Sequence, residues 1–157
     1  MEYNFRKIDI DAYDEDIIQE SELYEPDPRD PAAVLDEAKQ RQVAVRSALS
    51  KNDATGALTI ALENAPYGPN VEEAKVHDHL AHHPSILNAT RSTEIPGVVR
   101  ALPQDAQDTL MKYLYKGMAT TGMEDTSGNV LLGWHEKLTE AAGTGCIVRT
   151  MTDRRAV

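Results

Sequence analysis

Apolar residues recur with a helical period along most of the chain after residue 31. The clearest stretches predict helices over residues 31–49, 53–62, 103–117 and 129–141. Segments rich in proline, glycine, asparagine and aspartate separate these stretches, as is typical of loops. No run of alternating apolar and polar residues has the length of a strand. The pattern therefore predicts an all-α protein.

Short polar residues mark where several of these helices begin. Pro31 follows an aspartate and favours the first helical position, because it has no N–H to leave unpaired. A third helix begins at about residue 70, and Pro84 interrupts or ends it. The side chains that can accept a hydrogen bond from a free N–H of the first turn are Asp30, Asp53, Asn70 and Asn129.

The remaining helices are shorter and are bounded by proline and glycine. Residues 84–103 read as short helical pieces that Pro96-Gly97 and Pro103 break. Gly117 lies where a helix C-cap is expected. Gly143 and Gly145 end the next helix, and the last runs from about residue 146 to 153. Six or seven short helices with short loops predict an antiparallel bundle or helix-hairpin stack.

The core of this body is expected to be mostly aliphatic. Four of the eight aromatic residues precede residue 25, so few remain for the body. The body residues expected in the core from their position on helical stripes are Leu110, Met111, Tyr113, Leu114 and Trp134.

Charge divides the chain into two parts. The 157 residues include 26 acidic and 16 basic side chains, with a formal net charge of −10. Residues 1–31 hold eleven acidic and three basic residues, a net charge of −8, and the rest of the chain carries only −2. Prolines at 26, 28 and 31 indicate a semi-rigid linker. We expect an extended acidic N-terminal arm and linker at 1–31 and a helical body at 32–157.

Apolar residues within the arm admit two interpretations. A charged segment that stays fully in solvent and binds nothing should lack aromatic and β-branched residues, yet this one contains both. It either packs back on its own body or docks on another protein, where apolar anchors supply burial and acidic residues supply steering. The high charge density favours docking, because it opposes collapse onto the body.

Composition excludes several classes of partner and compartment. An acidic chain is not expected to bind nucleic acid or anionic membranes, since both require basic patches. One cysteine allows no disulfide within the chain and no cysteine-based zinc finger. No apolar stretch reaches the length of a membrane span, and the N-terminus lacks a signal-peptide pattern. We expect a soluble intracellular protein.

No motif indicates catalysis or a cofactor. His79 and His83 share one helical face in the cluster 77–83, but the glutamate of a His-Glu-x-x-His site is absent. The glycines at 143 and 145 lack the lysine of a phosphate-binding loop, so a helix-to-helix turn is favoured. Cys146 is expected to be a buried, inert thiol. We therefore expect a non-enzymatic protein without metal or cofactor.

Five separate strings resemble one known family. They occur in the family's order and spacing, from the arm to the last residues. The resemblance is to subunit 5 of the actin-related protein 2/3 complex, the small all-helical subunit of that assembly. The strings are residues 5–14 (FRKIDIDAYD), 110–118 (LMKYLYKGM), 131–137 (LLGWHEK), 147–149 (IVR) and 153–157 (DRRAV).

The resemblance implies a non-catalytic subunit of a seven-protein complex that nucleates branched actin filaments at the cytoplasmic cell cortex. It implies that the body docks on the β-propeller subunit and subunit 4, and that the arm tethers actin-related protein 2. Contact with actin filaments would be indirect.

Residue types within the matched strings then suggest binding roles. The arm's apolar anchors would be Phe5, Ile8, Ile10 and Tyr13. Arg6 and Lys7 would pair with acidic residues of the partner. The arm's acidic residues that would pair with basic residues of the partner are Asp9, Asp11 and Asp14. Either an acidic partner surface or the dipole of the last helix would account for the basic residues Arg149, Arg154 and Arg155.

Two other classes of function stay open from sequence. One is a free-standing adaptor protein with an acidic docking arm. The other is a small metal-binding protein that uses the His77–His83 cluster. Elution of the native protein within a large assembly would separate the first from a complex subunit, and a metal titration would test the second.

Overall fold

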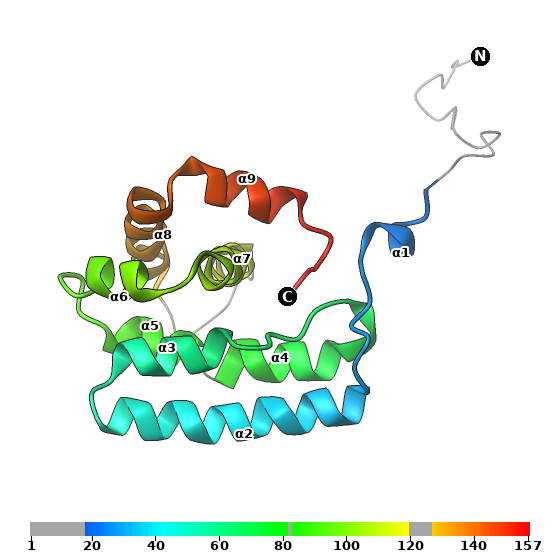
Figure 1. Cartoon of the computed structure of the whole chain (residues 1–157), viewed down its shortest axis with the longest axis horizontal. Helices are drawn as coiled ribbons and strands as arrows, with labels where there is room; N and C mark the ends of the chain where they lie inside the picture. The colour runs from blue at the N-terminus through cyan, green and yellow to red at the C-terminus, as the bar shows by residue number, and fades with distance from the viewer. Residues whose placement is uncertain (1–17, 82, 120–126) are drawn as a thin grey trace, which may run out of the picture.

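The structure is a computed structural model, and it describes residues 18–81, 83–119 and 127–157. All regular elements in these ranges are helices, so the predicted all-α class is confirmed (Figure 1). None of them is long and apolar enough to cross a membrane. The elements are α1 (Glu20–Leu23), α2 (Pro31–Ser50), α3 (Ala54–Leu62), the 3₁₀-helix η2 (Pro69–Val71), α4 (Glu72–Ala81), α5 (His83–Ala89), α6 (Ile95–Ala101), α7 (Gln104–Ala119), α8 (Gly128–Ala142) and α9 (Thr144–Thr152).

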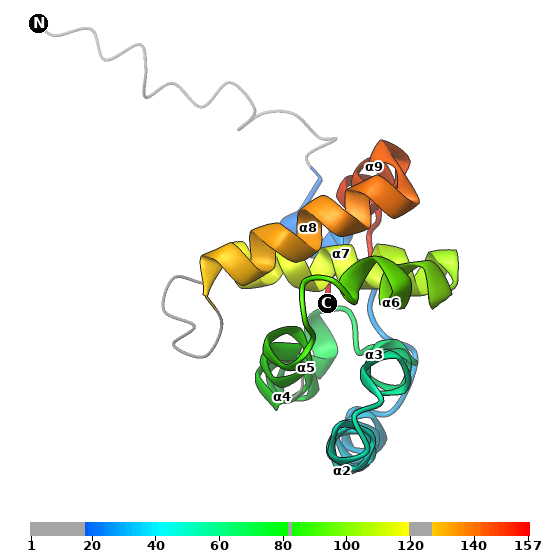
Figure 2. The same cartoon turned by 90° about the vertical axis from the view of Figure 1, so that its left-hand side faces the viewer.

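The helices form two groups that cross each other. In Figure 1, α2, α3 and α4 run lengthwise in the plane of the view, with α3 and α4 both packed against α2, whereas α7 is seen almost end-on. In the perpendicular view of Figure 2, α7 and α8 lie lengthwise and antiparallel, and α2 and α4 are seen end-on. The sequence predicted antiparallel helix pairs of this kind. It did not predict that the two groups of helices would cross at a steep angle.

Two predicted N-caps are confirmed. The carboxylate of Asp30 accepts a hydrogen bond of 3.2 Å from the backbone N–H of Ala33 at the start of α2. Asp53 accepts one of 2.8 Å from Gly56 at the start of α3. Both caps satisfy an N–H that has no partner inside its helix.

The predicted cap at Asn70 is wrong. Asn70 lies inside η2, and its side chain instead binds the backbone of Asp27 from the N-terminal segment. Asn129 is also not a cap, because α8 starts one residue earlier and Ser127 holds the N-cap position. Short polar residues near a helix start are equally able to make long-range contacts, and sequence cannot separate the two uses.

Glycine and proline were over-interpreted as breaks at three places. Pro96 and Gly97 lie in the first turn of α6, where proline costs no hydrogen bond. Gly117 lies within α7 and is buried. Gly145 lies inside α9, and only Gly143, with a φ of 76°, separates α8 from α9. Residues 83–101 therefore form two helices, and the body contains α2 to α9 in the described residues.

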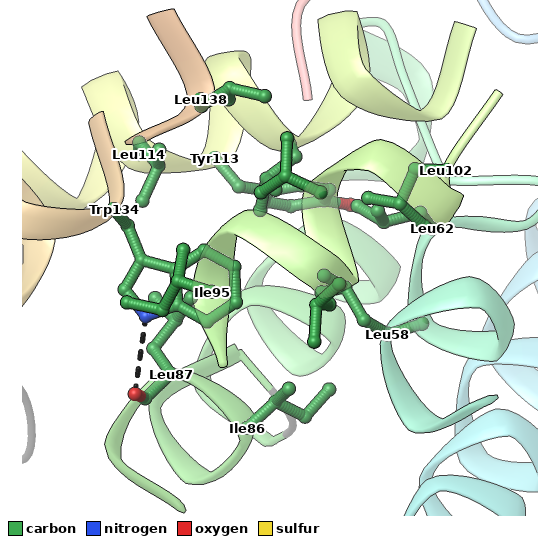
Figure 3. Close-up of a cluster of buried hydrophobic side chains, with 14 of the residues drawn as sticks. Leu58, Leu62, Ile86, Leu87, Ile95, Leu102, Tyr113, Leu114, Trp134 and Leu138 are labelled. Atoms are coloured by element: carbon green, nitrogen blue, oxygen red, sulfur yellow. Dashed lines mark hydrogen bonds between the residues drawn. The ribbon is translucent and has the colours of Figure 1, made fainter. Parts of the chain in front are cut away.

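One apolar cluster fills the space where the two helix groups meet (Figure 3). Trp134 of α8 is a fully buried member of this cluster, and its indole N–H donates a hydrogen bond of 3.2 Å to the backbone oxygen of Leu87. The predicted core residues on α7 are also buried. Cys146 is buried as expected, and burial raises the pKa of its thiol to about 12, so it stays protonated.

Candidate partner-binding site

The C-terminal tail, residues 153–157, lies against loop 64–69 and helix α7. The backbone N–H of Gly68 donates a hydrogen bond of 3.0 Å to the oxygen of Ala156. From α7, Lys112 donates to the backbone oxygen of Arg155 at 2.9 Å. These contacts fix the tail on the body although it has no regular structure.

The same tail holds the segment that leads into the N-terminal arm. The backbone N–H of Glu25 donates a hydrogen bond of 3.0 Å to the oxygen of Arg154. The guanidinium of Arg154 donates to the backbone oxygens of Glu22 and, at 3.3 Å, of Leu23. Residues 22–25 are thus attached to the tail mainly through backbone groups.

A paired charge completes this attachment. Arg155 donates two hydrogen bonds of 3.1 Å to the two carboxylate oxygens of Glu25. Its guanidinium also lies 5.0 Å from the centre of the Tyr67 ring, a cation–π distance. The hydrogen bonds to Glu25 raise the pKa of Arg155 above its usual value. Bidentate geometry makes this the strongest kind of surface ion pair.

The third predicted basic site residue also has a partner inside the chain. Arg149 of α9 donates hydrogen bonds of 2.6 and 2.8 Å to the carboxylate of Asp108 on α7. Burial is the largest single influence on Asp108 and opposes its ionisation. The hydrogen bonds from Arg149 and Cys146, together with the positive charges of Arg149 and Lys112, outweigh it, so the pKa of this carboxyl lies below its usual value. This pair ties α9 to α7, and it lies apart from the contacts of Arg154 and Arg155.

The segment after Glu25 is fixed independently of the tail. The side-chain amide of Asn70 accepts a hydrogen bond of 2.9 Å from the N–H of Asp27 and donates one of 2.8 Å to its oxygen. The buried carboxylate of Asp27 pairs with Arg29 at 2.5 Å. Arg29 reaches on to Glu37 of α2 at 3.1 Å. The Pro-Asp-Pro-Arg run is therefore held against the body.

The arm's predicted binding residues lie outside the described residues. No contact is therefore assigned to them, and their binding roles stay predictions. They are Phe5, Arg6, Lys7, Ile8, Asp9, Ile10, Asp11, Tyr13 and Asp14.

A groove of about 750 Å³ lies beside the fixed N-terminal segment. The segment at 27–29, the end of α3 and the start of α7 surround it. Acidic and basic side chains both line it, so its charge selects no ligand class. Within the described residues, no group of three or more histidine, cysteine or acidic side chains is placed to hold a metal ion. The side chains of His79, His82 and His83 lie outside the described part.

Comparison with known proteins identifies the family. The family model described as the ARP2/3 complex 16 kDa subunit (p16-Arc) matches residues 4–157. The chain belongs to this family. It is 36% identical over 154 residues to actin-related protein 2/3 complex subunit 5-C of Xenopus laevis, across 98% of this chain and 94% of that protein. It is 31% identical over 160 residues to subunit 5 of Saccharomyces cerevisiae, across the full length of both.

The p16-Arc match includes the arm string at 5–14 and the tail at 153–157, so the resemblance stated from the sequence is confirmed. A subunit 5-like protein of Homo sapiens is 32% identical over 154 residues. Because these relatives align along nearly the whole chain, the arm, the body and the tail all belong to the family's common length.

Exposed apolar side chains on α9 were not singled out from the sequence. Val148 is 60% exposed and Met151 is 75% exposed, three residues apart on one face of the helix. On α8, Leu132 is 59% exposed and lies in the string 131–137 that resembles the family. The expected burial of Cys146 was the signal that could have found this pair, because it places the opposite side of the last helix, with Val148 and Met151, in solvent.

Proposed function

We propose that this chain is a non-catalytic structural subunit of the actin-related protein 2/3 complex and supports the nucleation of branched actin filaments. The family match over residues 4–157 carries this proposal. The site of action is then the cytoplasmic actin cytoskeleton at the cell cortex. The nucleotide-binding sites of the complex belong to its two actin-related subunits. This chain contributes contacts that position other subunits.

The helical body docks on the β-propeller subunit and on subunit 4. A docking body needs a rigid surface with side chains that gain from burial on assembly. The exposed Val148 and Met151 on α9 supply such a surface, and the Arg149–Asp108 pair holds that helix against α7. We assign the outer face of α9 to the contact with these subunits.

The N-terminal arm tethers actin-related protein 2. Its net negative charge steers it towards a basic surface, and Phe5, Ile8, Ile10 and Tyr13 are anchors of a size that repays ordering by burial. A tether raises the local concentration of its partner without adding contacts at the nucleating surface. Arg6 and Lys7 pair with acids on this partner, and Asp9, Asp11 and Asp14 pair with bases.

Deletion of residues 2–17 tests the tether in the reconstituted complex. The deletion leaves in place every described residue that contacts the tail, so the body should still be incorporated. Retention of actin-related protein 2 and the rate of branch formation should both fall. Alanine at Phe5, Ile8, Ile10 and Tyr13 is the matched control for arm length and charge, and should weaken retention to a similar extent. Unchanged retention and branching in both variants would refute the tether.

A further inference from the structure

We propose that the C-terminal tail, residues 153–157, is a clasp that fixes the point where the N-terminal arm leaves the body. Arg154 and Arg155 are then positioning residues that act within the chain. The clasp stands on contacts inside this chain, and its consequence for partner retention rests on the proposed function of the arm. In this role the two arginines hold residues 22–25 of their own chain, and they need neither an acidic partner surface nor the dipole of the last helix.

The clasp has two sides, and both are well defined. On the arm side, Glu25 binds Arg154 through its backbone N–H and Arg155 through its carboxylate. On the body side, Lys112 of α7 pairs with Asp153 at 2.5 Å, and Gly68 binds the backbone of Ala156. The tail therefore links Glu25 to α7 and to the loop that contains Gly68.

The clasp is held by charge and backbone hydrogen bonds and not by burial. The two apolar side chains within residues 22–25 stay about half exposed, at 49% for Leu23 and 40% for Tyr24, and Ile18 just before them is 67% exposed. The Arg155–Glu25 pair is itself about half exposed. Bidentate geometry makes this pair stronger than one with a single contact, but its exposure leaves it screened by salt. The attachment is therefore reversible, and it leaves the apolar side chains of the segment only partly covered.

Opening the clasp would lengthen the tether by a known amount. Glu22, where the clasp begins, lies nine positions after the predicted anchor Tyr13. Without the clasp, the next residue held by the body is Asp27, bound by Asn70, which lies fourteen positions after Tyr13. Effective concentration falls roughly as the −3/2 power of tether length, so recapture of a partner should weaken about twofold. The direction in which the arm leaves would also no longer be fixed.

Amide hydrogen exchange of the full-length chain tests the clasp directly. Arg155→Glu should raise the exchange rate of the Glu25 amide roughly two- to fivefold, the range expected for losing an exposed ion pair. The swap variant Glu25→Arg/Arg155→Glu should restore the protection. The amide of Asp27, which binds Asn70, should keep its protection throughout.

Arg149→Glu is the matched control, because it makes the same charge change on the same terminal region but breaks the pair with Asp108. It should leave the Glu25 amide unaffected. Unchanged exchange in Arg155→Glu, an equal rise in the control, or no recovery in the swap variant would overturn the proposal. If Arg155→Glu unfolds the chain, as judged by amides within α7, Arg155→Gln replaces it with the same expected outcome.

The reconstituted complex separates this proposal from the tether itself. Arg155→Glu should weaken retention of actin-related protein 2 about twofold, and deletion of 2–17 should weaken it more. If the amide of Glu25 opens but neither change affects retention, the tether proposal fails and the clasp stands. If deletion releases the partner while the Glu25 amide is unchanged in Arg155→Glu, the clasp fails and the tether stands.

Discussion

The phenol of Tyr113 on α7 donates a hydrogen bond of 2.6 Å to the carboxylate of Asp78 on α4, and both side chains are buried. Arg41 of α2 pairs with the other oxygen of the same carboxylate. Burial, and then the negative charge of Asp78, raise the pKa of Tyr113 well above its usual value, so the phenol remains a donor. The two residues therefore join the crossed helix groups through a polar contact inside the core.

Removing the phenolic oxygen should destabilise the protein. Tyr113→Phe deprives a buried carboxylate of one donor, which should cost about 1 to 3 kcal/mol of unfolding free energy. Tyr115→Phe is the matched control on the same helix, since its phenol contacts His135 at 3.1 Å in a partly exposed position. Urea denaturation should show a loss of at most about 1 kcal/mol for the control. Equal losses would contradict a special role for the Asp78 contact.

Acid should weaken the attachment of the N-terminal segment through Asp27. Hydrogen bonds from Arg29 lower the pKa of this carboxyl below its unfolded value of 3.8 in spite of burial. A lowered pKa in the folded state gives stability that is complete above the unfolded pKa and is lost as the pH falls through the folded pKa. Unfolding free energy should therefore fall below about pH 4.

The asparagine variant isolates this contribution. Asp27→Asn should lose about 1 to 3 kcal/mol at pH 7, because Arg29 loses the buried one of its two charged partners. It should lose less than the natural chain on acidification to pH 3. Asp36→Asn, which removes an exposed carboxylate on α2, is the control for net charge. A pH dependence identical in the natural chain and Asp27→Asn would refute the assignment.

Two glycines should respond to alanine in opposite directions. Gly68 has a φ of 86°, and a Cβ there would lie 2.6 Å from the backbone oxygen of Glu25. Gly68→Ala should therefore cost about 1 to 3 kcal/mol and loosen residues 25–27. Gly97 lies in α6 with nothing within 4 Å of an added Cβ. Gly97→Ala should stabilise by up to about 1 kcal/mol, as thermal unfolding would show.

Helices and core were largely predictable because they depend on local pattern. Asp30 and Asp53 are caps as expected, and Trp134 is buried as expected. Asn70 was misread because its use is decided by Asp27, which lies 43 residues away. The Arg41–Asp78 pair was missed for the same reason, since sequence offers no signal for a salt bridge between distant helices.

The sequence allowed the basic residues of the candidate site to be predicted, but not the residues that they contact. Arg154 and Arg155 stood out as basic residues at the chain's end, but their contacts with residues 22–25 join opposite ends of the sequence. No local rule relates positions more than a hundred residues apart. The division of the chain at residue 31, which was based on charge, assigned residues 22–25 to the arm. It therefore gave no reason to expect contacts between these residues and the C-terminal tail.

Burial on assembly should distinguish α9 from the rest of the surface. Met151→Asp should leave the unfolding free energy within about 0.5 kcal/mol, because the side chain is exposed, yet reduce incorporation into the complex. Val43→Asp is the matched control, since Val43 is 67% exposed on α2. Incorporation is measured by co-purification with the other subunits. A comparable loss from both variants would contradict the assignment of docking to α9.

The most direct test of the account is a pull-down of the full-length chain from its native source, with the co-purifying proteins read by mass spectrometry and the size of the native assembly measured. The account predicts that the chain elutes in one large assembly with actin-related protein 2, the β-propeller subunit and subunit 4 in equal amounts. Elution near its own mass of 17.3 kDa, without these proteins, would contradict it.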